Sequence, residues 1–405
     1  MQSIQAYHFH HKKALIRVDF NVPLDGWGRI ADSARIDRSL PTIRKVLDDG
    51  GSAILLSHLG RPEGVKRPQF SLVQLRPYLQ DRLGVPVLFI PDYTSTQARK
   101  KIAQLQPGQV ILLENMRFYP GEMTGQRSFA QTLAALGDVY VQDAFSVCHR
   151  AHASIAVTPL HCKDRVMGFL LTEELRHISK LTTEMASKPF TAIVGGAKVT
   201  DKIQALHWLG KRANNILLGG VLANTFHQAL GTSLGHSRVA EEQVRNARTL
   251  YDLLQKRVNL VLPTDAVVVP HTGEAVPTTT AQIDTIPAGC SAVDIGPASR
   301  QTFSDIIEGS RTILWIGSVG ASEKYQEGTQ AVAKAVANAT QQGAFSCIGG
   351  GDTGKAVRRL GYVDKVSYVS TAGGALLAYI QDSDLPGLTS LVRSLYSSGL
   401  PVSLL

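Results

Sequence analysis

One stretch near the end of the chain, Phe345 to Lys355, combines residue types that can hold phosphate. Its apolar start indicates a buried strand, three glycines follow, and Asp352 and Thr353 open a helical stretch at 356–360. Glycines let backbone N–H groups approach an anion closely, and a helix N-terminus favours negative charge. The carboxylate of Asp352 could instead hold Mg²⁺ against phosphate oxygens.

Two known glycine patterns match this stretch only in part. Gly349-x4-Gly354-Lys355 resembles a phosphate-binding loop, but Ala356 stands where such a loop needs Ser or Thr to bind Mg²⁺. The spacing of Gly349, Gly351 and Gly354 resembles a dinucleotide fingerprint, but the next acidic residue comes too early. A strand-to-helix turn without a ligand is the third possibility. This stretch alone therefore leaves the ligand undecided.

Polar residues also follow several short apolar segments in the first half of the chain. Strands predicted at 14–18, 53–57, 110–113 and 139–141 alternate with helical segments, which indicates a parallel sheet. Open sheets of this kind bind ligands beyond the carboxyl ends of their strands. The polar residues near those ends are Asp19, Asn21, Arg35, His58, Arg61, Arg117, His149, Arg150 and His152. Each alone has an ordinary structural explanation, but guanidinium groups bind phosphate and carboxylate in bidentate fashion, so together they predict a site for a small phosphorylated acid.

Length and cysteine usage limit the class of protein. The chain of 405 residues can form two hydrophobic cores, and no apolar run approaches the 18 residues expected of a membrane span. Its polar, His-rich start lacks the apolar core of a signal peptide. The four cysteines show no Cys-x2-Cys spacing, which favours free thiols in a cytoplasmic protein over disulfides or a zinc site.

Positive charge is concentrated in the first part of the chain. The formal net charge is +9, of which +7 belongs to residues 1–170 and +2 to residues 171–405. Such an excess predicts an anionic partner for the first half. The basic residues form no long tracts and aromatic residues make up only 6% of the chain, so a small, highly charged anion fits better than nucleic acid.

A second alternation of strands and helices begins after Lys188-Pro189. Strands are predicted at 191–194, 216–218, 260–262, 313–316 and 367–369, besides the apolar start of the stretch described first. The expected fold class is therefore α/β, with two doubly wound parallel-sheet domains joined by a hinge helix. We expect a first domain at 1–171, a connecting helix at 172–187, a second domain at 188–387, and an extension at 388–405 that packs on the first domain.

Eight short motifs, in order over nearly the whole chain, resemble phosphoglycerate kinase. They are the segments 17–23, 57–62, 113–118, 143–145, 149–152, 195–202, 294–297 and 349–353. The resemblance implies reversible phosphoryl transfer between 1,3-bisphosphoglycerate and ADP, with Mg²⁺, in glycolysis and gluconeogenesis. It also implies small-molecule substrates, a cytoplasmic location and a monomer, with neither nucleic acid nor a membrane as partner.

The resemblance also assigns roles to individual residues. The 3-phosphoglycerate site would comprise Asp19, Asn21, Arg35, His58, Arg61, Arg117 and Arg150. The nucleotide site would comprise Gly196, Ala197, Lys198, Lys202, Gly219, Gly317, Glu323, Gly350, Gly351, Asp352 and Thr353, with Asp352 linked to the metal. Arg35 and Lys198 would stabilise the charge of the phosphoryl group in flight, and the N–H groups of Gly373 and Gly374 would support it.

Departures from the family pattern lie in the second half of the chain. Ile316 and Ser318 stand where the family usually has asparagine and proline, Val221 and Ala372 each replace a glycine, and Ala378 replaces a glutamate. An isoleucine cannot form the hydrogen bond that an amide can form with a nucleotide. The sequence therefore leaves two readings, an active phosphoglycerate kinase and a catalytically impaired binding or regulatory protein on the same fold, and the lysines and Asp352 favour the first.

Overall fold

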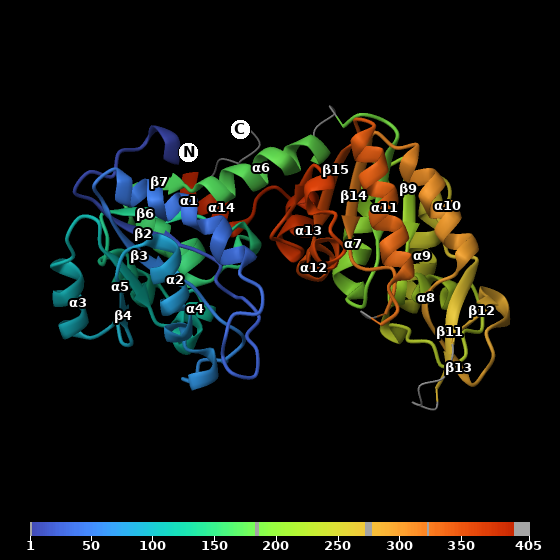
Figure 1. The fold of residues 1–405 in the computed structure, drawn as a ribbon, viewed down its shortest axis with the longest axis horizontal. Helices are drawn as coiled ribbons and strands as arrows, with labels where there is room; N and C mark the ends of the chain where they lie inside the picture. The colour runs from blue at the N-terminus through green and yellow to red at the C-terminus, as the bar shows by residue number, and fades with distance from the viewer. Residues whose placement is uncertain (1, 183–185, 272–277, 322–323, 393–405) are drawn as a thin grey trace. The chain divides into compact units, whose positions relative to one another are not determined.

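The computed structural model describes residues 2–182, 186–271, 278–321 and 324–392 (Figure 1). The chain divides into two compact units. Unit 1 comprises Met1–Arg176 and Asp382–Leu405, and unit 2 comprises His177–Gln381. The expected α/β class with two parallel-sheet domains is confirmed. Among the described residues, no helix combines the length and apolar character that a bilayer crossing requires.

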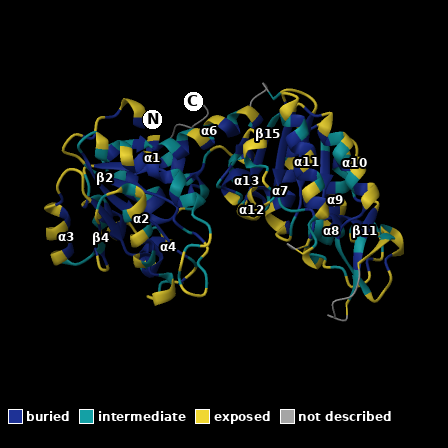
Figure 2. Ribbon diagram, in the orientation of Figure 1, coloured by how far each residue is buried: buried dark blue, intermediate teal, exposed yellow. Residues whose placement is uncertain are grey.

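Unit 1 is built on a seven-stranded sheet in the order β1-β7-β6-β2-β3-β5-β4, in which every neighbouring pair is parallel. The strands are β1 (Gln2–Ser3), β2 (Lys13–Arg17), β3 (Ser52–Leu56), β4 (Val87–Ile90), β5 (Val110–Leu113), β6 (Val139–Gln142) and β7 (Asp164–Met167). Strands β3, β5 and β6 are buried along their whole length, because helices and loops cover both faces of the sheet. Figure 2 shows the interior of the unit in dark blue and exposed, yellow segments on its outer helices. Strand β7, which lies between β1 and β6, was not predicted, because Asp164 and Arg165 are charged and only Val166 and Met167 remain as an apolar run.

The helices of unit 1 form near the helical segments that the sequence predicts, except for two short ones at 120–123 and 386–392, which were not predicted. They are α1 (Ala34–Asp48), α2 (Arg76–Leu83), α3 (Thr96–Ala103), α4 (Pro120–Met123), α5 (Arg127–Ala134) and α14 (Pro386–Val392). Helix α1 continues through Pro41 and buries Ile36, Leu40 and Ile43 in the core of the unit. Helix α3 begins where the Ser95 hydroxyl accepts a hydrogen bond from the N–H of Ala98 (3.2 Å), a typical N-cap.

Unit 2 contains a six-stranded parallel sheet in the order β10-β9-β8-β14-β15-β16. The strands are β8 (Phe190–Val194), β9 (Asn215–Leu218), β10 (Asn259–Val261), β14 (Thr312–Ile316), β15 (Phe345–Gly349) and β16 (Tyr368–Val369). The helices are α7 (Val199–Leu209), α8 (Gly220–Ala229), α9 (Val244–Leu254), α10 (Pro297–Glu308), α11 (Glu327–Gln341), α12 (Gly351–Arg359) and α13 (Gly374–Gln381). Helices α10 and α11 lie side by side (Figure 1) and cover Trp315, which is fully buried on β14.

A second sheet in unit 2 was not predicted. Strands β11 (Asp265–Pro270), β12 (Thr279–Gln282) and β13 (Cys290–Ile295) form a three-stranded antiparallel sheet in the order β12-β11-β13. It buries only a small apolar cluster that includes Val268 and Ile286. Strand β12 is largely exposed and polar, so its sequence lacks the apolar run by which the other strands were predicted.

Two segments connect or complete the units. Helix α6 (Phe169–Thr182) begins before the expected connecting helix and runs across the division between the units at 176 and 177. Residues 382–387, which the sequence placed in the second domain, belong to unit 1, because the Gly387 N–H donates to the Cys148 carbonyl (2.8 Å) and α14 packs against residues 153–161. Residues 393–405 of the expected extension lie outside the described residues.

Candidate functional site

A buried carboxylate lies at the centre of the polar residues that follow β2. Asp19 is 3% exposed and its Oδ2 accepts hydrogen bonds from Arg35 Nη1 (2.6 Å) and from the Ser146 hydroxyl. Burial raises the pKa of Asp19, but the Arg35 charge and the Ser146 hydroxyl outweigh that effect and bring the pKa to about 2. Asp19 is therefore ionised near neutral pH and holds Arg35 in place.

The loops that follow β2 and β3 are hydrogen-bonded to each other. Asn21 Oδ1 accepts from the backbone N–H of Gly60 (2.9 Å), and the Nδ1 atom of His58 lies 3.7 Å from Asp19 Oδ1. His58 is buried, and burial lowers its pKa well below the ordinary histidine value. Because β2 and β3 are adjacent parallel strands, their carboxyl ends bring these side chains together, as the sequence predicted.

Positive charge accumulates beside this carboxylate. Burial, followed by the charges of Arg150 and Arg17, lowers the pKa of Arg117 to about 10. Burial also lowers the pKa of Arg150, with the charge of Arg61 as the next cause. Arg117 Nη1 donates to the carbonyl of Gly60 (2.8 Å), whereas the buried Nε atoms of Arg117 and Arg150 have no hydrogen-bond partner among the described residues. Clustered guanidinium groups that repel one another in this way favour a bound anion.

Several contributors to this cluster were missed by sequence reasoning. Arg17 ends the central strand β2 and is 1% exposed, and Ser146 contacts Asp19. The buried Glu122 was also missed, and its Oε1 lies 3.8 Å from Nδ1 of His152, a residue that the sequence did predict. Burial lowers the pKa of His152 to about 4, and the charges of Arg117 and Arg150 act in the same direction. Arg17 could have been found from its position at the end of an apolar strand, but Ser146 and Glu122 carry no signal in the sequence.

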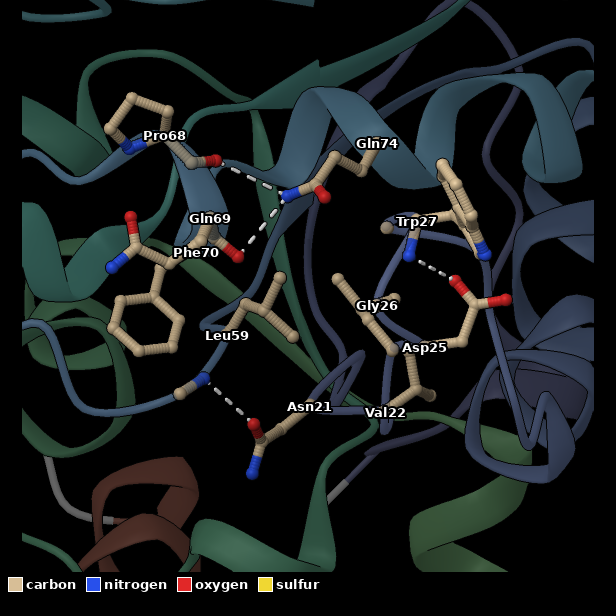
Figure 3. Close-up of a pocket in the computed structure, with 13 residues that line it drawn as sticks. Asn21, Val22, Asp25, Gly26, Trp27, Leu59, Pro68, Gln69, Phe70 and Gln74 are labelled. Atoms are coloured by element: carbon tan, nitrogen blue, oxygen red, sulfur yellow. Dashed lines mark hydrogen bonds between the residues drawn. The ribbon is translucent and has the colours of Figure 1, made fainter.

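A cavity of about 700 Å³ adjoins the loop of Asn21 (Figure 3). Leu59 and Phe70 line it from one side and Val22 and Trp27 from another. None of its lining residues is an arginine or a lysine. It is therefore a mainly apolar neighbour of the basic cluster and not the cluster's own anion site.

Glycine-rich turns of unit 2 lie close together at the ends of β8 and β14. The N–H of Gly195 donates to the carbonyl of Ile316 (2.9 Å), and the N–H of Gly317 donates to the Thr353 hydroxyl (2.8 Å). Gly317 has φ +94°, a conformation that other residues rarely adopt. These contacts bring three turns that are distant in sequence, the ones at 195–198, 317–320 and 350–353, to one edge of the sheet.

The charged side chains of these turns differ in exposure. Lys198 and Asp352 are exposed, whereas Lys202 is 8% exposed on α7. Burial lowers the pKa of Lys202 to about 8, while the nearby charges of Asp201 and Asp352 raise it and that of Lys198 lowers it. The two lysines and Asp352 are thus close enough to influence each other electrostatically.

The backbone of Gly350 and Gly373 forms another close approach. Gly350 has φ +100° and precedes α12, and its N–H donates to the carbonyl of Ala372 (2.8 Å). A Cβ atom on Gly373 would lie 2.9 Å from Gly350 Cα, so glycine is required there. The remaining predicted nucleotide residues also lie on these turns: Gly196 and Ala197 follow β8, Gly219 precedes α8, Gly351 starts α12 and Gly374 starts α13. Glu323 lies outside the described residues.

Most of the residues that depart from the family pattern pack against other parts of unit 2. Ile316 ends β14, is 3% exposed, and lies opposite Gly349 of β15. The Ser318 hydroxyl donates to the carbonyl of Gly320 (3.0 Å). Ala372 is buried, and Val221 and Ala378 lie on α8 and α13. Ile316 therefore occupies a core position.

Known proteins are similar to this chain over nearly its whole length. The family model for phosphoglycerate kinase matches residues 4–383. The chain belongs to the phosphoglycerate kinase family. It is 42% identical over 383 residues to a phosphoglycerate kinase of Chlorobaculum tepidum, covering 94% of this chain and 96% of the relative. The phosphoglycerate kinase of Desulfosudis oleivorans is 40% identical over 397 residues, covering 97% and 99%.

Solved structures of phosphoglycerate kinases have the same fold. The structure from Coxiella burnetii is 37% identical, with a TM-score of 0.82 over 96% of this chain and 98% of that chain. The structure from Pyrococcus horikoshii is 27% identical, with a TM-score of 0.83 over the same shares. This protein is therefore a phosphotransferase of the phosphoglycerate kinase type, with a role in glycolysis and with ATP and ADP among its substrates.

Proposed function

We propose that the basic cluster of unit 1 binds 3-phosphoglycerate and 1,3-bisphosphoglycerate, and that the glycine-rich turns of unit 2 bind ADP and ATP. The observation that supports this most is the partly buried pair Arg117 and Arg150, whose Nε atoms have no partner among the described residues. A phosphate group bound by these guanidinium groups would offset their mutual repulsion. The cluster also contains Asp19, Asn21, Arg35, His58 and Arg61.

In this proposal, phosphoryl transfer depends on charge and positioning and needs no general base. The accepting group is a carboxylate or a phosphate, so no proton has to be removed. The transferred group carries negative charge on its three outer oxygens. Arg35 and Lys198 would stabilise that charge from the acid and the nucleotide sides, and backbone N–H groups of Gly373 and Gly374 would add to it.

Mg²⁺ is proposed to bind through Asp352 together with nucleotide phosphates. The described residues contain no group of three or more His, Cys, Asp or Glu side chains that could hold a metal ion. Mg²⁺ usually binds through one or two carboxylates plus substrate phosphates, which suits a single exposed carboxylate in the first turn of α12. The ion would neutralise phosphate charge as the phosphoryl group moves.

A catalytically impaired protein on the same fold is the alternative. Lys198, Lys202, Asp352 and Arg35 are all present, and the substituted Ile316 is a core residue, so nothing at the proposed site favours that alternative. We further propose a cytoplasmic monomer without nucleic-acid or membrane partners.

A coupled assay tests the proposal directly. The full chain is supplied with ADP, Mg²⁺ and 1,3-bisphosphoglycerate, and ATP formation is followed. We expect turnover in the range common for kinases, about 1–100 s⁻¹ or faster. Absence of ATP formation, with both substrates still binding in calorimetry, would favour the impaired alternative.

A further inference from the structure

A buried arginine lies directly behind the proposed acid site. Arg17 is 1% exposed, and its guanidinium donates to the Ser154 hydroxyl (Nε, 2.9 Å) and to the carbonyls of Val18 and Leu56. Its Nη2 lies 3.4 Å from His58 Nδ1. None of its contacts within the described residues is a direct salt bridge. An unbalanced buried cation is costly, so a carboxylate is expected nearby.

Glu122 supplies that balance through a serine. Its side chain is fully buried, its Oε2 accepts from the Ser154 N–H (2.8 Å) and its Oε1 accepts from the Ser154 hydroxyl (2.6 Å). The Ser154 hydroxyl thus donates its one hydrogen bond to Glu122, and the hydroxyl oxygen remains free to accept a hydrogen bond from Arg17. Tyr140 holds the serine in place by donating to its carbonyl (2.8 Å). The result is a continuous chain from carboxylate to hydroxyl to guanidinium.

The far end of this chain reaches His58 at one ring nitrogen. Nδ1 of His58 lies between Arg17 Nη2 at 3.4 Å and Asp19 Oδ1 at 3.7 Å. These neighbours require opposite protonation states of Nδ1. A guanidinium can only donate a hydrogen bond to Nδ1, whereas a carboxylate can only accept one from it. The Arg17 contact is the shorter one, and Oδ1 of Asp19 already accepts a hydrogen bond from the backbone N–H of Asn21 (3.1 Å). The geometry therefore favours a ring whose Nδ1 is an acceptor.

We propose that Arg17 is a positioning residue that holds neutral His58 in the tautomer protonated on Nε2, so that Nε2–H is a hydrogen-bond donor for the anionic substrate. This inference rests on the proposed place of His58 in the acid site. Burial of His58 and the charges of Arg117, Arg17 and Arg35 disfavour a second proton on the ring and outweigh the opposing charge of Asp19, which is consistent with the lowered pKa of His58. The acid site thereby gains a hydrogen-bond donor, Nε2–H of His58, although the His58 ring carries no charge.

Nuclear magnetic resonance tests the tautomer without reference to activity. The full chain is labelled with ¹³C and ¹⁵N in its histidine rings, and the His58 signals are identified among the twelve histidines by their loss in His58→Gln. We expect the wild-type ring to be protonated on Nε2. In Arg17→Met we expect protonation to move to Nδ1, which then donates to Asp19. Protonation on Nδ1 in the wild type, or an unchanged tautomer in Arg17→Met, would overturn the proposal.

Steady-state kinetics test the consequence for the substrate. In Arg17→Met the KM for 3-phosphoglycerate is expected to rise about tenfold, the scale of one lost hydrogen bond, with the ATP KM unchanged. Arg17→Lys keeps a charge and a donor and should retain the tautomer and most of the affinity, even if Arg17→Met folds poorly. The matched control is Arg165→Met, which removes another guanidinium of unit 1 that donates to the Ser390 carbonyl (3.0 Å).

The two experiments separate the inference from the function on which it rests. If Arg165→Met raises the 3-phosphoglycerate KM as much as Arg17→Met does, the effect is general destabilisation and the proposal is wrong. If the tautomer changes in Arg17→Met but the 3-phosphoglycerate KM does not, the control of His58 by Arg17 stands and the proposed role of His58 in substrate binding is overturned.

Discussion

At the scale of single residues, the nucleotide side presents two lysines with different surroundings. Lys198 is exposed at the end of the 195–198 turn, whereas Lys202 is buried one helical turn later. An exposed ammonium group can follow a phosphoryl group as it moves, and a buried one supplies a fixed positive charge. We therefore expect substitutions at the two positions to affect different measured quantities.

Substitution of Lys198 is expected to reduce turnover. Lys198→Ala removes a charge that matters most when the phosphoryl group is in flight, so kcat should fall roughly 10²-fold or more. Steady-state kinetics in both directions measure the change. Lys211→Ala, which removes an exposed lysine of the same unit beyond the end of α7, is the control and should leave kcat unchanged. Near wild-type kcat in Lys198→Ala would refute the assignment.

The buried Lys202 predicts proton uptake when ADP binds. Burial lowers its pKa to about 8, so above that pH the free protein holds it mostly neutral. Bound phosphates would raise the pKa and the lysine would take up a proton. In the absence of nucleotide, the unfolded chain binds more protons than the folded one between about pH 8 and the ordinary lysine pKa. The free energy of unfolding therefore rises with pH in this range, because the cost of burying a charged lysine disappears as the lysine loses its proton.

Calorimetry in buffers with different ionisation enthalpies checks this uptake. We expect ADP binding near pH 9 to take up close to one proton per ADP and to weaken as pH rises further, and Lys202→Met to abolish the uptake. Uptake that persists unchanged in Lys202→Met would show that another group titrates.

Ile316 is expected to act on stability more than on nucleotide affinity. Its side chain is 3% exposed beside β15, so Ile316→Asn would bury an amide without an evident partner, at a cost of about 1–3 kcal/mol in unfolding free energy. Urea unfolding and ADP calorimetry on Ile316→Asn with Ser318→Pro separate the two effects. An ADP affinity that improves threefold to tenfold would instead show that the family's amide contacts the nucleotide.

At the scale of elements, α14 completes unit 1 although it comes last in the chain. The Ser390 hydroxyl donates to the Ile155 carbonyl (3.2 Å), and Arg165 donates to the Ser390 carbonyl. Gly387 approaches Cys148 so closely that a Cβ atom there would lie 2.9 Å from Cys148 Cα and 2.8 Å from Ile155 Cγ2. A glycine at position 387 therefore allows α14 to pack closely against this surface.

Gly387→Ala is expected to destabilise unit 1. Because the added methyl group meets backbone, we expect a loss of about 1–3 kcal/mol in unfolding free energy, measured by urea denaturation, with hydrogen exchange at residues 153–161 locating the change. Gly26→Ala is the matched control, since a Cβ atom there meets nothing within 4 Å. Equal stability of the two variants would show that α14 adjusts freely.

At the scale of the whole molecule, the two substrates are assigned to different units. The excess positive charge of residues 1–170 matches the unit with the arginine cluster, and the glycine-rich turns belong to the other unit. Binding of each substrate should then respond separately to mutation. A multivalent anion should compete with the phosphorylated acid in particular.

Arg61→Ala is expected to raise the KM for 3-phosphoglycerate about tenfold or more and to leave the ATP KM unchanged. Sulfate should inhibit wild type competitively against 3-phosphoglycerate and more weakly in Arg61→Ala. Arg44→Ala is the control, because Arg44 lies on α1 and donates to the Arg82 carbonyl away from the cluster. Equal effects on both KM values would contradict separate sites.

The sequence by itself predicted the class of fold, the positions of most strands along the chain, and most residues of both proposed sites. It could do so because buried parallel strands are short apolar runs, and because the polar residues after them must meet at one edge of a sheet. Asp19, Asn21 and His58 come together for that reason, as do the glycine-rich turns at 195–198 and 350–353.

Only the tertiary structure decided which buried residues act on those sites. Glu122, Ser154 and Arg17 are far apart in the sequence and become a hydrogen-bonded chain only when β2 packs against residues 153–157. Strand β12 of the antiparallel sheet lacks the apolar run that predicts a strand, and α14 joins unit 1 through contacts with Cys148 and Ile155. Periodicity and spacing describe neighbours along one element, whereas these features depend on contacts between distant segments.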